Sequence, residues 1–116
     1  MRFMTFVKSA ENQGAPPPAL MEAIGKLGEE AFGNGTMVQM GGLSPSAASS
    51  RVRLSNGKIV VTDGPFSEAK EVIGGFAVFE LPTREAAVEA AKRFMEVHRE
   101  HWPGWEGETE VRQVFG

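Results

Sequence analysis

The fold is decided by residues 75–98, which read GFAVFELPTREAAVEAAKRFMEVH. Residues 75–81 alternate as a strand that is apolar on both of its faces. Thr83 is a favoured N-cap residue, so a helix is predicted to begin near Arg84 and to end before Pro103-Gly104. The apolar stripe of this helix comprises Ala87, Val88, Ala91, Phe94, Met95 and His98. The stretch therefore predicts a strand followed directly by an amphipathic helix.

The same kind of unit occurs at the N-terminus, where residues 2–8 form a predicted strand and residues 17–32 an amphipathic helix. Asn56-Gly57 lies between two short alternating runs, which predicts a hairpin with a type I′ turn. The remaining strands are predicted over residues 36–40, 51–55, 58–62 and 108–115, with Gly41-Gly42 breaking the first of them. The order β-α-β, hairpin, β-α-β predicts a ferredoxin-like α+β fold that carries an inserted hairpin.

The strands over residues 2–8 and 75–81 leave one sheet face without cover. Both are apolar on two faces, whereas the two helices of this fold lie on the same side of the sheet. A second subunit packed against the open face is the simplest cover, so we expect a symmetric homodimer. The alternative is that the inserted hairpin folds over that face.

The chain has 116 residues, no cysteine and a formal charge of −3. This length predicts one domain over residues 1–116. The lack of cysteine excludes a disulfide scaffold and Cys-ligated metals, and the mild acidity argues against nucleic-acid binding. The apolar N-terminal run is too short for a signal peptide, and no run approaches the roughly 20 apolar residues of a membrane span. We therefore expect a cytoplasmic protein that does not bind membranes.

A loop with the sequence DGPFSEAKE, residues 63–71, separates the hairpin from the next strand. Asp63 stands at a strand end, where its carboxylate can accept hydrogen bonds from nearby backbone N–H groups. Glycine and proline set the turn, and Phe66 can anchor the loop in the core. One interpretation is a purely structural turn. The other is the edge of a pocket that carries the charges of Asp63, Lys70 and Glu71.

This loop resembles the signature of the YCII-related proteins of the DGPF type, usually read as DGPF-(A/S)-E-(T/A)-K-E. The resemblance covers nearly the whole chain, because four other segments occur in the order of the family: Met1-Arg2-Phe3-Met4, Gly41-Gly42-Leu43-Ser44-Pro45, Gly74-Gly75-Phe76 and Glu110-Val111-Arg112-Gln113-Val114-Phe115. It implies a small bacterial protein with a ferredoxin-like fold that assembles as a dimeric α+β barrel. The role of this family is largely uncharacterised. Its genes often lie beside those of sigma factors of the extracytoplasmic-function type, which implies a regulatory context.

The resemblance also suggests a catalytic role for one acidic residue. The wider YCII family has been proposed to contain enzymes that use a His–Asp pair, and Asp63 lies in the matching signature. The histidine does not carry over, since the only histidines are His98 and His101, late in the second helix.

Chemistry-bearing side chains outside the loop are few. His98 follows Phe94 and Met95 on the helical stripe, where burial can tune its pKa; it is either a second catalytic residue or a histidine at the edge of the core. Trp102 and Trp105 would wall an apolar pocket or anchor the dimer. Arg51 and Arg53, on one face of the hairpin, would bind a carboxylate or keep the hairpin soluble. A metal held by both histidines lacks an indicated third ligand, so neither a metal nor a cofactor is predicted.

Together these residues predict a dimeric small-molecule-binding module with a pocket near the loop Asp63-Gly64-Pro65-Phe66. The predicted catalytic residues are Asp63 and His98, and the predicted ligand-binding residues are Arg53, Pro65, Phe66, Lys70 and Trp102. Two alternatives remain open. One is an enzyme of lyase or isomerase type that uses Asp63 as general acid or base. The other is an interaction partner in sigma-factor-linked regulation.

Overall fold

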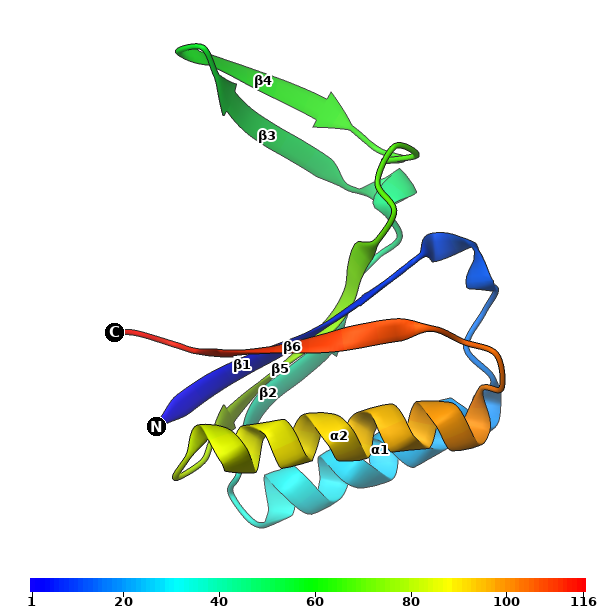
Figure 1. Cartoon of the computed structure of the whole chain (residues 1–116), viewed down its shortest axis with the longest axis vertical. Helices are drawn as coiled ribbons and strands as arrows, with labels where there is room; N and C mark the ends of the chain where they lie inside the picture. The colour runs from blue at the N-terminus through cyan, green and yellow to red at the C-terminus, as the bar shows by residue number, and fades with distance from the viewer.

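The computed structural model describes residues 1–116. It contains six strands and two long helices (Figure 1), which are β1 (Arg2–Ser9), α1 (Pro18–Gly33), β2 (Met37–Gly42), β3 (Ser50–Ser55), β4 (Lys58–Asp63), β5 (Val72–Glu80), α2 (Arg84–His101) and β6 (Gly107–Gln113). Two single turns of 3₁₀-helix, η1 (Glu11–Gln13) and η2 (Ser46–Ala48), precede α1 and β3.

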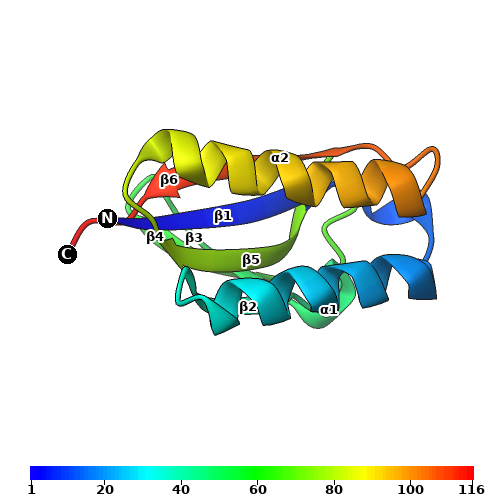
Figure 2. The ribbon, with the colours of Figure 1, turned by 90° about the horizontal axis from the view of Figure 1, so that it is seen from below.

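Four strands form one antiparallel sheet in the order β2-β5-β1-β6. Both helices lie on the same face of this sheet (Figure 2). This is the predicted ferredoxin-like α+β arrangement, which is confirmed. The N-cap of α2 is also as predicted, because the Thr83 hydroxyl oxygen accepts a hydrogen bond from the Ala86 N–H at 3.1 Å.

The prediction that Gly41-Gly42 breaks the second strand is wrong. β2 continues to Gly42 and pairs with β5 at Gly41↔Phe76 and Gly42↔Gly75. A Cβ atom at Gly41 would lie 3.0 Å from the ring of Phe76. Here glycine makes room for an aromatic ring on the neighbouring strand, so the strand is not interrupted.

The central strand β1 separates a helix-covered face from an open face. Phe3 and Thr5 point toward the helices and are buried. Met4 and Phe6 point the other way, beside Val78 and Phe76 of β5, and are half-buried. The two-faced character read from the sequence therefore corresponds to a sheet whose second face has no helix over it (Figure 1).

The hairpin β3–β4 forms a separate two-stranded sheet that projects away from the rest of the chain (Figure 1). Its turn has positive φ at Asn56 (52°) and Gly57 (75°), as a type I′ turn requires. The hairpin does not cover the open sheet face. The radius of gyration of 15.7 Å reflects this projection, because a compact domain of this length has a value of roughly 13 Å. Neither helix is long and apolar enough to cross a membrane.

Candidate functional site

The sequence-predicted site residues lie in two separate places. Asp63, Pro65, Phe66 and Lys70 belong to the base of the hairpin or the loop after it, and Arg53 lies on β3. His98 and Trp102 lie at the C-terminal end of α2, where they line a cavity between the helices and the sheet. None of the five residues of the hairpin and loop lines that cavity.

The loop after β4 is held against η2 and the residue that follows it by two hydrogen bonds. The Gly64 N–H donates to the Ser49 carbonyl at 2.8 Å, and a Cβ atom at residue 64 would lie only 1.5 Å from the Ser46 carbonyl oxygen. Only glycine fits there. The Phe66 N–H donates to the Ser46 hydroxyl at 3.1 Å, which holds the next part of the loop.

Ser46 also connects this loop to η1. Its hydroxyl donates to one carboxylate oxygen of Glu11, and its N–H donates to the other at 2.8 Å. These bonds hold the pKa of Glu11 below its ordinary value, because they favour the charged carboxylate. Ser46 is 5 % exposed, so the junction formed by Glu11, Ser46 and Gly64 joins three segments at a buried point.

The charged groups of the loop face each other or the solvent. The Arg51 guanidinium lies over the ring of Phe66, 3.9 Å from the ring centroid, and it forms an ion pair with Glu68. Of the two arginines that the sequence predicts on this hairpin face, Arg51 therefore makes the contact with the loop, whereas Arg53 is exposed. Asp63 is exposed, and one of its carboxylate oxygens accepts from the Ser50 hydroxyl at 2.8 Å.

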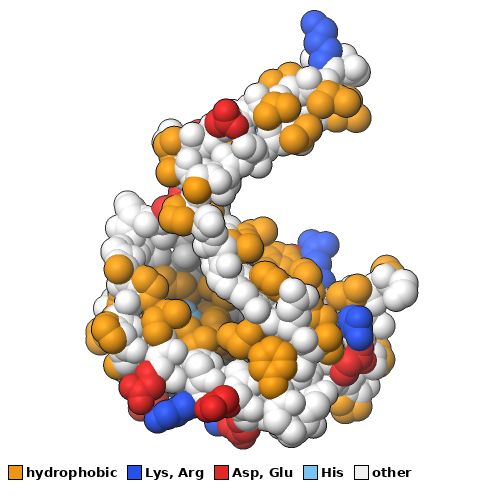
Figure 3. Space-filling view, turned by 180° about the vertical axis from the view of Figure 1, so that it is seen from behind, with side chains coloured by type: hydrophobic (Ala, Val, Ile, Leu, Met, Phe, Trp, Pro, Cys, Tyr) orange, Lys and Arg blue, Asp and Glu red, His pale blue; other side chains and the backbone are white.

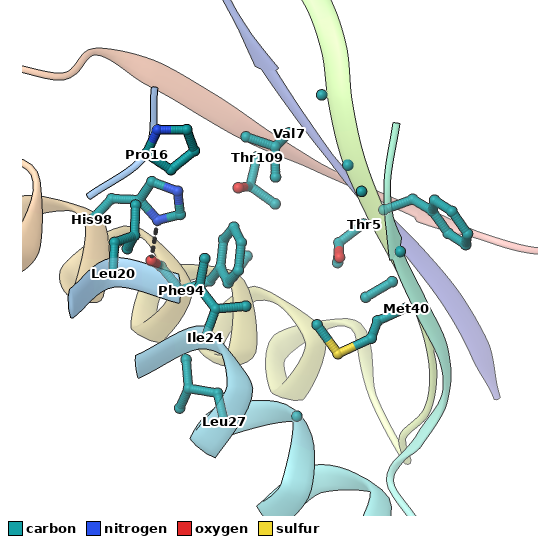
Figure 4. Close-up of a pocket in the computed structure, with 18 of the residues that line it drawn as sticks. Thr5, Val7, Pro16, Leu20, Ile24, Leu27, Met40, Phe94, His98 and Thr109 are labelled. Atoms are coloured by element: carbon teal, nitrogen blue, oxygen red, sulfur yellow. Dashed lines mark hydrogen bonds between the residues drawn. The ribbon is translucent and has the colours of Figure 1, made fainter. Parts of the chain in front are cut away.

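The cavity has a volume of about 680 Å³ and lies between α1, α2 and the helix-facing side of the sheet. Figure 3 shows hydrophobic side chains around the hollow in the body, and Figure 4 shows how the lining residues are arranged. Most of the labelled wall is aliphatic, sulfur-containing or aromatic, and comprises Val7, Leu20, Ile24, Leu27, Met40 and Phe94. The volume is within the range of about 300–1,000 Å³ that is usual for small-molecule sites.

His98 is the buried titratable residue of the cavity, with 6 % of its surface exposed. Its Nδ1–H donates to the Phe94 carbonyl at 2.9 Å, since a carbonyl oxygen can only accept. The other ring nitrogen, Nε2, is then the acceptor of a neutral imidazole. Burial lowers the pKa of His98 below its ordinary value of 6.5, which keeps the ring neutral near pH 7.

Aromatic rings surround this imidazole. The ring centroids of Phe94 and Trp105 lie 4.7 and 4.5 Å from that of His98, and Trp102 stacks on Trp105 at 5.9 Å. All four rings line the cavity. The sequence predicts both tryptophans as possible wall residues, and Trp105 is the one whose ring contacts His98.

Two threonine hydroxyls are further polar groups of the interior. Thr5 on β1 is 6 % exposed, and Figure 4 shows its hydroxyl directed toward the space between sheet and helices. Thr109 on β6 has a buried Oγ1 without any hydrogen-bond partner. Sequence reasoning missed both. The available signal was that Thr5 alternates with Phe3 and Val7, which places a polar residue on the helix-facing side.

Charged residues lie only at the margin of the cavity. Glu30 and Arg93 pair at 3.3 Å and have side chains about 60 % exposed, and Glu11 is bonded to Ser46. No three side chains of His, Cys, Asp or Glu converge on a point that could hold a metal ion. The cavity therefore offers an apolar wall, one neutral imidazole and two hydroxyls. It brings His98 and Trp102 together but does not include Asp63.

A family model described as the YCII-related domain matches residues 1–113. Comparison with curated proteins gave no match.

Proposed function

The chain belongs to the YCII-related domain family, and from that premise we propose that it is a dimeric small-molecule-binding module whose ligand occupies the cavity between the helices and the sheet. The observation that carries this proposal is an apolar cavity of about 680 Å³ that contains unengaged polar atoms of His98 and Thr109. Protein interiors are packed almost without voids, and buried polar groups normally find partners. A ligand would supply both the missing packing and the missing hydrogen bonds.

The loop at residues 63–71 has a different part in this proposal. Its backbone is fixed by Ser46 and Ser49, and its side chains pair with Arg51 or face solvent. These contacts support a structural role, in which the loop fixes the hairpin to the body.

A thermal-shift screen against a small-molecule library tests the binding function, because a ligand of the native state raises the melting temperature. The variant Ile24→Phe fills part of the cavity, since Ile24 projects into it from α1. Val88→Phe is a matched control, because Val88 is exposed on α2 and lies outside the cavity wall. Hits are expected to stabilise the wild type and Val88→Phe but not Ile24→Phe. Equal stabilisation of all three proteins would contradict the proposed site.

The surface area of the single chain supports the dimeric part of the proposal. The accessible surface is 7953 Å², whereas a compact monomer of this mass exposes roughly 6,200 Å². The excess of about 1,800 Å² exceeds the roughly 800 Å² that each partner contributes to a standard interface. An excess of this size fits a subunit that is completed by a second copy of itself.

Much of the exposed apolar surface of the chain lies on the hairpin and on the open sheet face. One hairpin face consists of two cross-strand apolar pairs, Val52↔Val61 and Leu54↔Ile59, whose members are 65–73 % exposed. An isolated two-stranded hairpin is at best marginally stable in water. Contact with a second copy would cover this face, in the isologous arrangement usual for homodimers.

Two adjacent residues of β4 provide a matched test. Val61 belongs to the apolar hairpin face, whereas Val60 lies on the opposite face beside Arg53. Val61→Lys is expected to shift the protein from dimer to monomer in sedimentation equilibrium, because it buries an unpaired charge in the interface. Val60→Lys should leave the dimer intact. A monomeric wild type would overturn the dimer without affecting the proposed cavity site.

A further inference from the structure

Resting on the proposed binding function, we infer that the ligand is an uncharged, mainly aromatic molecule that donates a hydroxyl or N–H hydrogen bond to Nε2 of His98. Three properties of the cavity lead to this class of ligand: an imidazole acceptor, a set of rings beside it, and the absence of interior charge.

The acceptor is defined by the hydrogen bond on the other side of the ring. Because Nδ1 holds the proton and gives it to the Phe94 carbonyl at 2.9 Å, Nε2 carries a lone pair. This is the only hydrogen bond that the protein makes to the imidazole. His98 is more than nine-tenths buried and projects into the cavity in Figure 4. Nε2 faces the cavity without a protein donor, so a molecule that brings a donor to it gains more than one that does not.

The rings around His98 favour a flat, unsaturated partner. Phe94 and Trp105 lie within 4.7 Å of the imidazole, centroid to centroid, and Trp102 extends the same wall. Aromatic pairs at such separations are favoured beyond the area that they bury. A planar ring placed against this wall can direct a hydroxyl at its edge toward Nε2.

The charges argue against an ionic ligand. The interior contains no charged side chain, since His98 is neutral, and the marginal residues Glu30 and Arg93 already pair with each other. Glu11 accepts two hydrogen bonds from Ser46. A carboxylate or ammonium group on the ligand would thus be desolvated without a counter-charge, which is strongly unfavourable. The hydroxyls of Thr5 and Thr109 can satisfy a second, neutral polar group.

Isothermal titration calorimetry at pH 7.5 with three related probes tests this class. 2-Naphthol presents a hydroxyl donor, 2-methoxynaphthalene has the same rings without the donor, and 2-naphthoate carries a negative charge. The expected result is that 2-naphthol binds about tenfold more tightly than 2-methoxynaphthalene, the upper end for one hydrogen bond, and that 2-naphthoate binds most weakly.

Two variants connect the preference to the imidazole. His98→Phe keeps a ring but removes the acceptor, so it should abolish the preference for 2-naphthol. His101→Phe is the matched control, because His101 lies three residues further along α2 and outside the cavity wall, and it should keep the preference. If His98→Phe fails to fold, the affinities of the wild type for the three probes still test the inferred ligand class.

The outcomes separate the two proposals. Equal affinity for 2-naphthol and 2-methoxynaphthalene, or tightest binding of 2-naphthoate, would overturn the inferred ligand class and leave the cavity as a binding site. Failure of all three probes to bind, or binding of 2-naphthol that Ile24→Phe leaves unchanged, would overturn both the ligand class and the proposed site.

Discussion

His98 donates its Nδ1 proton to the backbone carbonyl of Phe94 at 2.9 Å, one turn earlier on α2. This bond fixes the tautomer of a ring that is almost fully buried. It thereby directs the acceptor nitrogen away from its own helix, toward the cavity. The hydrogen bond thus sets the direction of the acceptor nitrogen, whereas burial keeps the imidazole uncharged by lowering its pKa.

The buried state of His98 makes stability depend on pH. Its folded-state pKa lies below 6.5 because of burial, so the unfolded chain binds the proton more readily. The stabilising effect is fully present above the unfolded-state pKa. It decreases as the pH falls below about 6.5, by at most about 1.4 kcal/mol per pH unit. Urea unfolding at pH 7.5 and pH 5.5 should show this loss in the wild type and in His101→Gln, but a much smaller loss in His98→Gln. An equal loss in all three proteins would show that other groups cause it.

Substitution of Gly64 by alanine should strongly destabilise the protein. The new Cβ would lie 1.5 Å from the Ser46 carbonyl oxygen, a backbone atom that cannot move aside alone. Overpacking of this kind costs about 1–3 kcal/mol or more. Gly74→Ala is the control, because nothing lies within 4 Å of a Cβ at that position. The urea midpoint should fall markedly for Gly64→Ala alone, and similar midpoints for both variants would contradict the close contact.

Ser46→Ala should destabilise the junction formed by Glu11, Ser46 and Gly64. The substitution leaves the Phe66 N–H without its acceptor and removes one donor from Glu11. Loss of a buried hydrogen-bonding partner costs about 1–3 kcal/mol, so a decrease of this size is expected in the free energy of unfolding. Ser55→Ala, at the exposed end of β3, should have little effect. A Ser46→Ala protein as stable as the wild type would show that the junction contributes little.

The ammonium group of Lys8 should lose its proton only at an unusually high pH. Hydrogen bonds to Glu110 at 2.9 Å and Glu108 at 3.0 Å raise the pKa of its ammonium group to about 12. NMR titration of the Lys8 side chain should show Glu110→Gln lowering this pKa more than Glu108→Gln, because the bond to Glu110 is the larger cause. Glu89→Gln is a control on α2, where Glu89 pairs with Lys92. A Lys8 pKa near 10.5 in the wild type would contradict the ion pairs.

Local sequence signals predicted most of the fold. The helix α2, its N-cap Thr83 and the Asn56-Gly57 turn each depend on neighbouring residues, and all three occur as predicted. Val88 is the exception within the predicted apolar stripe of α2, because it is 40 % exposed. The error at Gly41 has a non-local cause, because the glycine accommodates Phe76 from a strand more than thirty residues away. No local pattern contains that information.

The candidate site was less accessible to sequence reasoning. The helical stripe indicated His98, but the cavity depends on how far the helices stand from the sheet, a distance that no periodicity encodes. The loop at residues 63–71 has the composition of a pocket edge and also that of a tight turn. Its geometry depends on the backbone of Ser46, which is distant in the sequence. The roles predicted for Asp63, Arg53, Pro65, Phe66 and Lys70 remain predictions for experiment.

The strand order also governs what the growing polypeptide can do during its synthesis. β1 pairs only with β5 and β6, and β2 pairs only with β5. Neither β1 nor β2 can find a partner until residues 72–80 have left the ribosome, whereas β3 and β4 can pair as soon as their two-residue turn is made. The nascent chain can therefore form its projecting hairpin before its four-stranded sheet, and the apolar strand β1 stays unpaired until β5 has been synthesised.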